Sequence, residues 1–196
     1  ERRREITRPL TVAASYAHSA FVDAAGRLLT CGSAVGPRAE HQLGQGPGVL
    51  EAPVPAAVLG LGGVRVASVA AGKQHTLALS ADGAVYSFGM GWNGALGHGD
   101  YEHQHAARRV AALEGERVTQ VACGGSFSLA LTHAGRAYSW GRGDEGALGH
   151  GDEEVQHAAR RVAALEGKRV TPVACGNGFS VALAATGRAY SSGRGD

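Results

Sequence analysis

The sequence is poor in cysteine, proline and aromatic residues, with 3 Cys, 6 Pro and 6% aromatic residues among 196. The cysteines Cys31, Cys123 and Cys175 are odd in number and form no CxxC pair, which excludes a disulfide framework and a zinc knuckle. Their sparse use favours reduced thiols in an intracellular protein. No apolar run approaches the ~18 residues of a membrane-spanning helix, and no apolar segment follows the charged start ERRRE. We therefore expect a cytoplasmic or nuclear protein with no membrane span and no secretory signal.

An excess of one charge is also lacking, since the formal net charge is +2. This balance argues against a dedicated nucleic-acid or membrane-surface binder, and we expect no direct sequence-specific nucleic-acid binding. Glycine, by contrast, is abundant at 31 residues. With so few prolines, the excess indicates neither collagen nor a disordered Pro/Gly tract. It is typical of tight turns and of crowded strands that leave no room for a Cβ atom.

Internal repetition is the dominant feature of the chain. The segments GAVYSFGMGWNGALGHGD, GRAYSWGRGDEGALGHGD and GRAYSSGRGD begin at Gly83, Gly135 and Gly187, 52 residues apart, and a weaker copy begins at Gly26. Because the chain starts with Glu1 rather than Met, we expect it to be a piece of a longer protein. The repeats predict one propeller domain with these divisions: a flank at 1–9, a divergent repeat at 10–65, near-twin repeats at 66–117 and 118–169, and a truncated repeat at 170–196.

Each unit has the pattern of short strands joined by turns. In HTLALS, Leu77 and Leu79 alternate with smaller residues, and this period of two predicts a strand. The turn signal Asp82-Gly83 separates it from a second strand, AVYSFG. Valines such as Val66 open a further strand, and RRVAAL is predicted as the fourth. A helix is the alternative for that last segment, because AARRVAALE contains good helix formers. Its place between glycine-rich turns favours the strand.

Four short strands in ~50 residues are typical of a β-propeller blade. One such unit buries too little apolar surface to stand alone, so its faces need neighbouring units. We therefore predict an all-β propeller to which this chain contributes about 3.5 to 4 four-stranded blades. Unpaired strand edges at the ends of such an arc invite association, and we expect the isolated chain to self-associate.

The repeated pattern "ACG…SLALT..G..YSWG.G..GALGHGD…RRV..L.G" resembles the regulator-of-chromosome-condensation repeat family. The resemblance extends from about Pro9 to Asp196. It implies a seven-bladed ring, of which this chain would form part. The family includes a chromatin-bound guanine-nucleotide exchange factor for the small GTPase Ran, plant ultraviolet-B photoreceptors, ciliary GTPase-regulator proteins, and scaffolds fused to ubiquitin ligases or kinases. The fold alone does not choose among these activities.

Two of these activities depend on features that can be recognised in a sequence. Photoreceptor-like members carry Trp in the inner Gly-x-x-His-Ser/Thr turn, and the turns at 72–76, 124–128 and 176–180 contain none, which disfavours light sensing. The exchange factor resembles a disc with a projecting wedge, and the unit lengths leave no room for a wedge within these residues. We therefore predict a non-catalytic protein-interaction scaffold. The alternative is an exchange factor for a Ran-like small GTPase, associated with chromatin, whose wedge or fused ligase or kinase domain would lie outside this chain.

Several motifs suggest chemistry but have simpler interpretations. The GxGxxG at Gly89–Gly94 recurs in the next unit and precedes ALGHGD, whose glycines would break the helix that a dinucleotide fold requires, so a turn is favoured. His98 and His150 lie in glycine-broken loops without a cysteine nearby, which favours a solvated loop over a zinc site. No arrangement pairs a nucleophile with a base. We predict no catalytic residue, no cofactor and no metal ligand.

Two repeat positions predict packing between units. His18 and His75 stand where later units have Phe127 and Phe179, so this position is expected to fill space rather than transfer protons. The tyrosine that precedes Ser in YS, such as Tyr86, is expected to pack between blades.

Loops that vary on a constant frame are the expected binding residues, because such loops select partners. Trp92 is the strongest candidate, since the next unit has Asp144 at that position and the frame does not require an aromatic residue there. The predicted loops for a protein partner, a small GTPase or a chromatin protein among the options, are represented by Trp92, Asn93, Tyr101, Arg142, Asp144, Glu145, Glu153 and Glu154.

Overall fold

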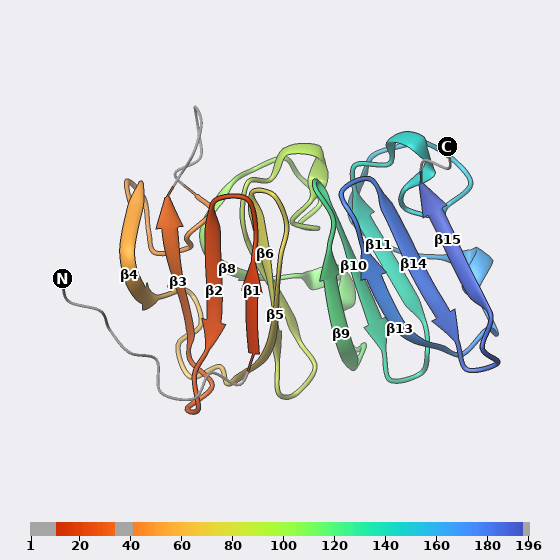
Figure 1. Ribbon diagram of the computed structural model, residues 1–196, viewed down its shortest axis with the longest axis horizontal. Coiled ribbons are helices and arrows are strands. Elements are labelled where there is room, and N and C mark those ends of the chain that lie inside the picture. The colour runs from red at the N-terminus through yellow and green to blue at the C-terminus, as the bar shows by residue number, and fades with distance from the viewer. Residues whose placement is uncertain (1–10, 34–40, 194–196) are drawn as a thin grey trace.

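The computed structural model describes residues 11–33 and 41–193 of the chain. The strands form four antiparallel sheets that follow one another along the chain (Figure 1). The first two sheets contain β1 (Thr11–Ala14), β2 (His18–Val22), β3 (Leu28–Ser33) and β4 (Glu51–Ala57), then β5 (Val66–Ala71), β6 (His75–Ser80), β7 (Val85–Gly89) and β8 (Gln104–Arg109). The last two contain β9 (Val118–Cys123), β10 (Phe127–Thr132), β11 (Ala137–Gly141) and β12 (Gln156–Arg161), then β13 (Val170–Cys175), β14 (Phe179–Ala184) and β15 (Ala189–Gly193).

Within each sheet the strands pair in chain order, and the first strands of successive sheets lie side by side, β1 beside β5, β5 beside β9 and β9 beside β13. Successive small meander sheets stacked face to face are the blades of a propeller. Three sheets have four strands and the last has three. The structure therefore confirms the predicted all-β fold and the about 3.5 to 4 blades.

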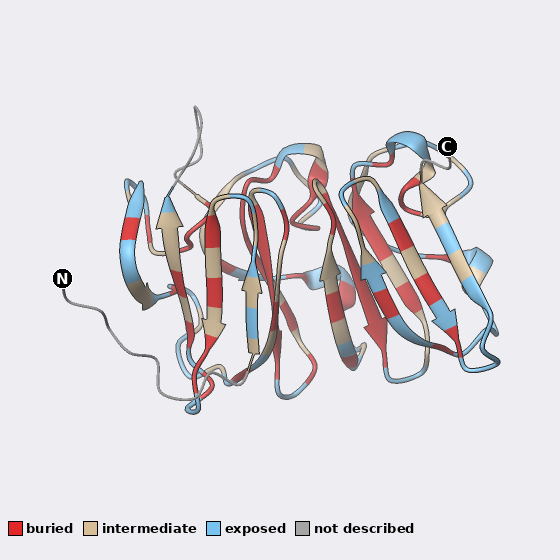
Figure 2. Cartoon of the chain, viewed as in Figure 1, coloured by how far each residue is buried: buried red, intermediate tan, exposed pale blue. Residues whose placement is uncertain are grey.

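The apolar core lies between the blades rather than inside any one of them. In Figure 2 the inner strands β6 and β10 are almost wholly buried, whereas the outer strands β4 and β15 are mostly exposed or intermediate. Leu77 and Leu79 of β6 face the third blade and pack with Val121 and Trp140, whereas Ala78 faces the first blade. Alternation along one strand thus supplies both neighbouring interfaces. The predicted packing of the repeated tyrosines between blades is confirmed for Tyr86, at the first interface, and for Tyr138, at the second.

The fourth strand differs from its prediction in position. A strand is present, but it covers QHAARR and ends at Arg109, and the following Ala111–Leu113 forms a 3-10 turn, η2. Ala163–Leu165 repeats this turn as η4 after β12. The chain leaves the sheet here because the Leu113 N–H bonds back to the Val110 carbonyl and the Leu113 side chain is buried beneath the blade. The alternation of the strand therefore ends at Arg109, before Val110 and Leu113, the apolar residues that suggested a strand.

Two faces result from this topology. The upper face, at the top of Figure 1, consists of the first turn of each sheet (15–17, 72–74, 124–126 and 176–178) and the long loops 41–50, 90–103 and 142–155. The lower face consists of the second turn of each sheet (23–27, 81–84, 133–136 and 185–188) and the links between sheets (58–65, 110–117 and 162–169). Each unit thus delivers the same segments to the same face.

Candidate functional site

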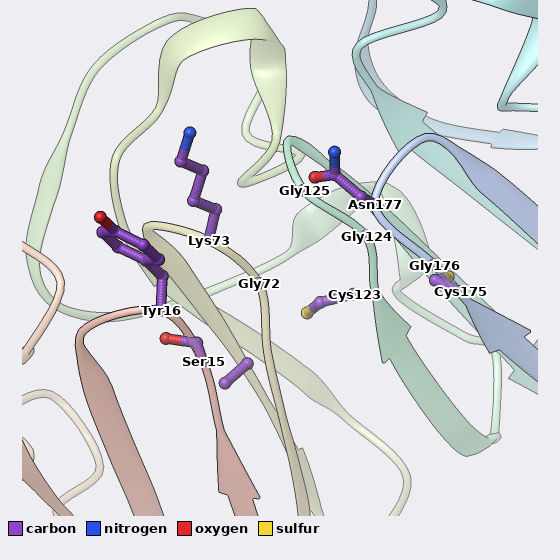
Figure 3. A pocket seen from close by; sticks show the side chains of 11 residues that line it. Ser15, Tyr16, Gly72, Lys73, Cys123, Gly124, Gly125, Cys175, Gly176 and Asn177 are labelled. Atoms are coloured by element: carbon purple, nitrogen blue, oxygen red, sulfur yellow. The ribbon is translucent and has the colours of Figure 1, made fainter.

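The inner turns of the upper face are fixed to one another by backbone hydrogen bonds. The N–H of Lys73 donates to the carbonyl of Gly125 at 3.2 Å, and the N–H of Gly125 donates to the carbonyl of Asn177 at 3.0 Å. Figure 3 shows Tyr16, Lys73, Gly125 and Asn177 on four successive turns, and these residues line a hollow of about 530 Å³. These bonds hold the rim of the arc rigid, so its side chains are presented at fixed spacing.

Two cysteines lie just below this rim. Cys123 and Cys175 end inner strands and line the same hollow (Figure 3). Burial raises the pKa of the Cys175 thiol to about 12, and burial followed by the nearby Cys175 raises the pKa of Cys123 well above its ordinary value. Both therefore stay protonated at neutral pH and are poor nucleophiles and poor metal ligands.

Trp92 lies on the upper face in the loop that joins β7 to β8. It starts a 3-10 turn, η1 (Trp92–Gly94), and its side chain is half-exposed. Its ring lies 5.7 Å from that of His103, and the His103 Nδ1 accepts the N–H of Gly91 at 3.0 Å. The His103 ring thus contacts the indole while 45% of the Trp92 surface remains exposed. This geometry suits an interface anchor, although binding by Trp92 remains a prediction.

Tyr101, in the same loop, also packs against the next blade. Its ring meets the His157 ring edge-on at 4.4 Å, and the N–H of Gly99 donates to the His157 carbonyl at 2.9 Å. The loop therefore crosses from the second blade to the outer strand of the third. Loop 41–50 crosses in the same way, since the N–H of Gly46 donates to the carbonyl of His105 at 3.0 Å. Sequence reasoning identified the loop with Trp92 and Tyr101 as a binding element but missed that this loop, like loop 41–50, also connects adjacent blades.

The next loop contributes Arg142, Asp144 and Glu145 to a single groove of about 520 Å³, which Lys73 and Asn177 also line. The guanidinium of Arg142 donates to Asp144 at 2.7 and 2.5 Å. This pair lowers the pKa of Asp144 and raises that of Arg142, so both remain charged. The structure thus brings together three of the predicted residues and places Trp92, Asn93 and Tyr101 one blade earlier. Asn93 and Glu145 occupy equivalent left-handed positions with φ of 59° and 61°.

Glu153 and Glu154 also lie on the upper face and are exposed or nearly so, outside the groove lining. Carboxylates outnumber cations on the described upper face. Asp100, Asp144 and Asp152 are paired with Arg108, Arg142 and Arg160, and beyond these pairs the loops carry Glu102, Glu145, Glu153 and Glu154 against Lys73. The upper face is therefore acidic overall, a property that the chain's near-zero net charge conceals.

His18 and His75 are buried, as their exchange with phenylalanine predicted, but they do more than fill space. His18 Nε2 hydrogen-bonds with Thr76 Oγ1 at 2.8 Å, and His75 Nε2 hydrogen-bonds with Ser128 Oγ at 2.9 Å. Each bond joins one blade to the next. The pKa of both imidazoles is lowered to about 4, by burial for His18 and by burial together with the neighbouring His18 for His75, so both are neutral in the folded protein at neutral pH.

The predicted solvated loop is wrong for His98 and His150. The Nε2 atoms of His98 and His150 hydrogen-bond with Ser87 Oγ and Ser139 Oγ, each at 3.0 Å, beneath the loops. Burial, followed by a neighbouring arginine, lowers both pKa values, to about 4 for His98. Within residues 11–33 and 41–193, no group of three or more His, Cys, Asp or Glu is arranged to hold a metal ion. The GxGxxG segments form turns, as predicted, with η1 and η3 (Asp144–Gly146) as short 3-10 pieces.

Comparison with known proteins gives a consistent result. The family described as "Regulator of chromosome condensation (RCC1) repeat" matches residues 25–79, 82–131 and 134–183. Each match begins just before the third strand of one sheet and ends in the second strand of the next, so the family unit straddles two blades. Among the part of the chain that the structure describes, no helix is long and apolar enough to cross a membrane.

Individual relatives are similar over most of this chain. The E3 ubiquitin-protein ligase HERC2 of Mus musculus is 39% identical over 175 residues, which is 87% of this chain and 4% of that protein. The ultraviolet-B receptor UVR8 of Arabidopsis thaliana is 39% identical over 157 residues, 80% of this chain and 36% of the receptor. The chain therefore spans only a minor part of these curated relatives.

Solved structures agree with the sequence relatives. Human WBSCR16 superposes with a TM-score of 0.84 at 25% identity, over 98% of this chain and 49% of that one. Prp20p from Saccharomyces cerevisiae, described together with its binding properties to Gsp1p and histones, superposes with a TM-score of 0.78 at 25% identity, over 97% of this chain and 47% of that one.

Proposed function

The chain belongs to the regulator of chromosome condensation repeat family, and on that premise we propose that it is a non-catalytic scaffold for protein–protein interaction. Its upper face is the proposed binding surface. Stacked blades fix the backbone, and loops of different composition on that constant frame select the partner. The partner would be a protein, with the acidic loops favouring a basic surface on it.

One observation carries this proposal: the loops that differ between the twin blades are those fastened to their neighbours. The loop containing Trp92 and Tyr101 is anchored on the third blade by His157, yet the Trp92 side chain remains half-exposed. A fixed backbone with an exposed aromatic side chain loses little entropy on binding. The mixed charges of Arg142, Asp144 and Glu145 on the next blade would supply specificity at the rim.

The variant Trp92→Ala tests this proposal. We expect it to lose captured proteins in quantitative pull-down from a lysate of the source cell, while its thermal unfolding midpoint stays within a few degrees of the parent's. Ala112→Ser, on the lower face, is the matched control and should capture the same proteins as the parent. Equal capture by Trp92→Ala and the parent would contradict the assignment of Trp92 as an anchor.

The alternative is a guanine-nucleotide exchange factor for a Ran-like small GTPase, associated with chromatin. The similarity to Prp20p, described with its binding to Gsp1p and histones, supports this alternative. The even length of the near-twin units argues against it, because no loop among the described residues is long enough for a wedge. Release of fluorescent GDP from Ran, measured with the full chain and its flanking sequence, separates the two: acceleration supports exchange, and an unchanged rate supports the scaffold.

A further inference from the structure

The lower face has the opposite charge to the upper face. Its carboxylates are nearly all used in ion pairs: Asp23 with Arg27, Glu114 with Arg109, Glu116 with Arg136, and Glu166 with Arg161. The remaining cations of this face make no ion pair among the described residues: Arg65, Arg117, Lys168, Arg169 and Arg188. All five are exposed, so the lower face presents positive charge that the protein itself does not neutralise.

The twin repeats show where this charge is concentrated. HAARRVAALEGERV and HAARRVAALEGKRV differ only at Glu116 and Lys168. Glu116 pairs with Arg136 and accepts a hydrogen bond from the Tyr138 hydroxyl at 2.9 Å. In the next unit, Lys168 instead lies over the Tyr190 ring at 5.4 Å. The equivalent arginine, Arg188, makes no ion pair with the residues that the structure describes. The frame accepts either residue, so packing does not require the lysine.

A small cavity opens beside this cluster on the lower face of the third blade. It has a volume of about 230 Å³ and is lined by Arg136, Arg161 and Arg169 together with Glu166. The backbone of the turn at 134–137 closes one side, and Val162 and Leu165 provide an apolar floor. Arg136 and Arg161 are already paired with Glu116 and Glu166, so the cationic character of the cavity comes from Arg169 and from the neighbouring Lys168. The apolar side chains in the lining suit the methylene groups of an entering side chain.

The backbone at Arg169 is also unusual. Its φ is +45°, in the left-handed region that non-glycine residues rarely occupy. The equivalent Arg65 and Arg117 are not among the left-handed residues. The unit that exchanged Glu for Lys is thus also the unit in which the following arginine adopts a costly conformation, next to the cavity.

We propose that this lower-face cavity and its rim, Lys168, Arg169 and Arg188, bind an acidic polypeptide segment whose Asp or Glu side chain enters the cavity. Guanidinium groups bind carboxylates through paired, charge-assisted hydrogen bonds. The cavity is smaller than the ~300 Å³ at which small-molecule sites begin, so it fits one side chain. A nucleic-acid strand is disfavoured because its phosphates belong to a continuous backbone, which cannot enter a cavity sized for one side chain. This site is separate from the upper-face proposal and does not depend on it.

The test measures binding of a fluorescein-labelled peptide of alternating Glu and Ser to the full chain by fluorescence anisotropy at about 0.1 M salt. We expect Lys168→Glu, which restores the residue of the twin unit, to weaken binding about tenfold or more. The matched control is Lys73→Glu, the same change of charge on the upper face, and it should leave binding within about twofold of the parent.

Arg169→Asn separates a ligand role from a structural one. Asparagine tolerates the left-handed region but carries no charge, so this variant should bind the peptide more weakly while unfolding no earlier than the parent. The proposal is overturned by any of three results: no peptide binding by the parent, equal weakening by Lys168→Glu and Lys73→Glu, or tighter binding of a single-stranded DNA of equal charge than of the peptide.

Discussion

Removing one buried imidazole should remove a defined part of the protein's sensitivity to acid. His75 sits between the second and third blades, with its pKa lowered to about 4 by burial, whereas in the unfolded chain its pKa is near 6.5. Below pH 6.5 the unfolded chain therefore binds a proton that the folded protein cannot accept until about pH 4. The free energy of unfolding consequently falls between those two pH values and is unaffected above them. The proposed variant is His75→Phe, which copies Phe127 of the following blade.

The size of the effect follows from the two pKa values. A depression of the pKa from 6.5 to about 4 corresponds to a total loss of about 3 kcal/mol once the pH is well below 4. At pH 5 the loss is about 2 kcal/mol, because the unfolded imidazole is almost fully protonated there and the folded one is not. His18 is lowered to a similar value by the same cause and should contribute a comparable loss. At pH 7.5 the variant keeps the Ser128 hydroxyl bonded to the Ala95 carbonyl at 2.8 Å, so it should fold.

The assay is denaturant unfolding at pH 7.5 and pH 5.0, a range in which the carboxylates with lowered pKa remain ionised. The parent should lose about 2 kcal/mol more than His75→Phe between these two values. The reverse variant, Phe127→His, places an imidazole beside Ser180, the equivalent of Ser128, and should steepen the pH dependence by a similar amount. If His75→Phe and the parent weaken equally on acidification, the buried histidine is not the source of the sensitivity and the reasoning fails.

Two further predictions concern stability at neutral pH. Glu145→Asn copies Asn93 at a left-handed position and should raise the free energy of unfolding by about 1 kcal/mol in denaturant titration; a decrease would show that the Glu145 side chain outweighs the backbone cost. Gln120 donates to the carbonyl of Val173 at 2.8 Å and accepts its N–H at 3.1 Å, which joins the third and fourth blades. Gln120→Ser, the residue present at Ser68 in the second blade, should cost about 1–3 kcal/mol in the same titration, and no change would show that water replaces the amide.

The strands could be predicted because the sequence pattern of each strand recurs in several repeats. Alternation in HTLALS is weak on its own, but the same alternation recurs in FSLALT and FSVALA, and the turn glycines recur with it. The fourth strand was misplaced because its apolar residues, Val110 and Leu113, are buried by a 3-10 turn beneath the blade rather than by alternation. A period-two pattern cannot distinguish these two ways of burying the same residues.

The site was less predictable because its residues meet across blade boundaries. Nothing in the sequence near His75 indicates that Ser128 lies opposite it, 53 positions later. In the same way, the contact of Tyr101 with His157 depends on a loop that crosses to the next blade. Exposure of Trp92 could be inferred from its single occurrence, because a residue that the other units lack is not required by the frame. The repeat divisions proposed from the sequence remain predictions, since the family unit is out of phase with the sheets.

The charge separation between the two faces follows from repetition itself. Each unit sends its long loop to the upper face and its link to the lower face, so a residue type fixed at one repeat position is placed on the same face by every blade. Arg65, Arg117 and Arg169 are one such position, and Asp100 and Asp152 are another. A near-zero net charge therefore says little about the binding of charged partners by a repeat protein, because opposite charges cancel in the sum while remaining apart in space. The position of each charged residue within the repeat decides on which face its charge lies, and so decides whether that face is acidic or basic. A single exchange, such as Glu116 in one unit for Lys168 in the next, reverses the charge at one place on the lower face while the fold stays the same.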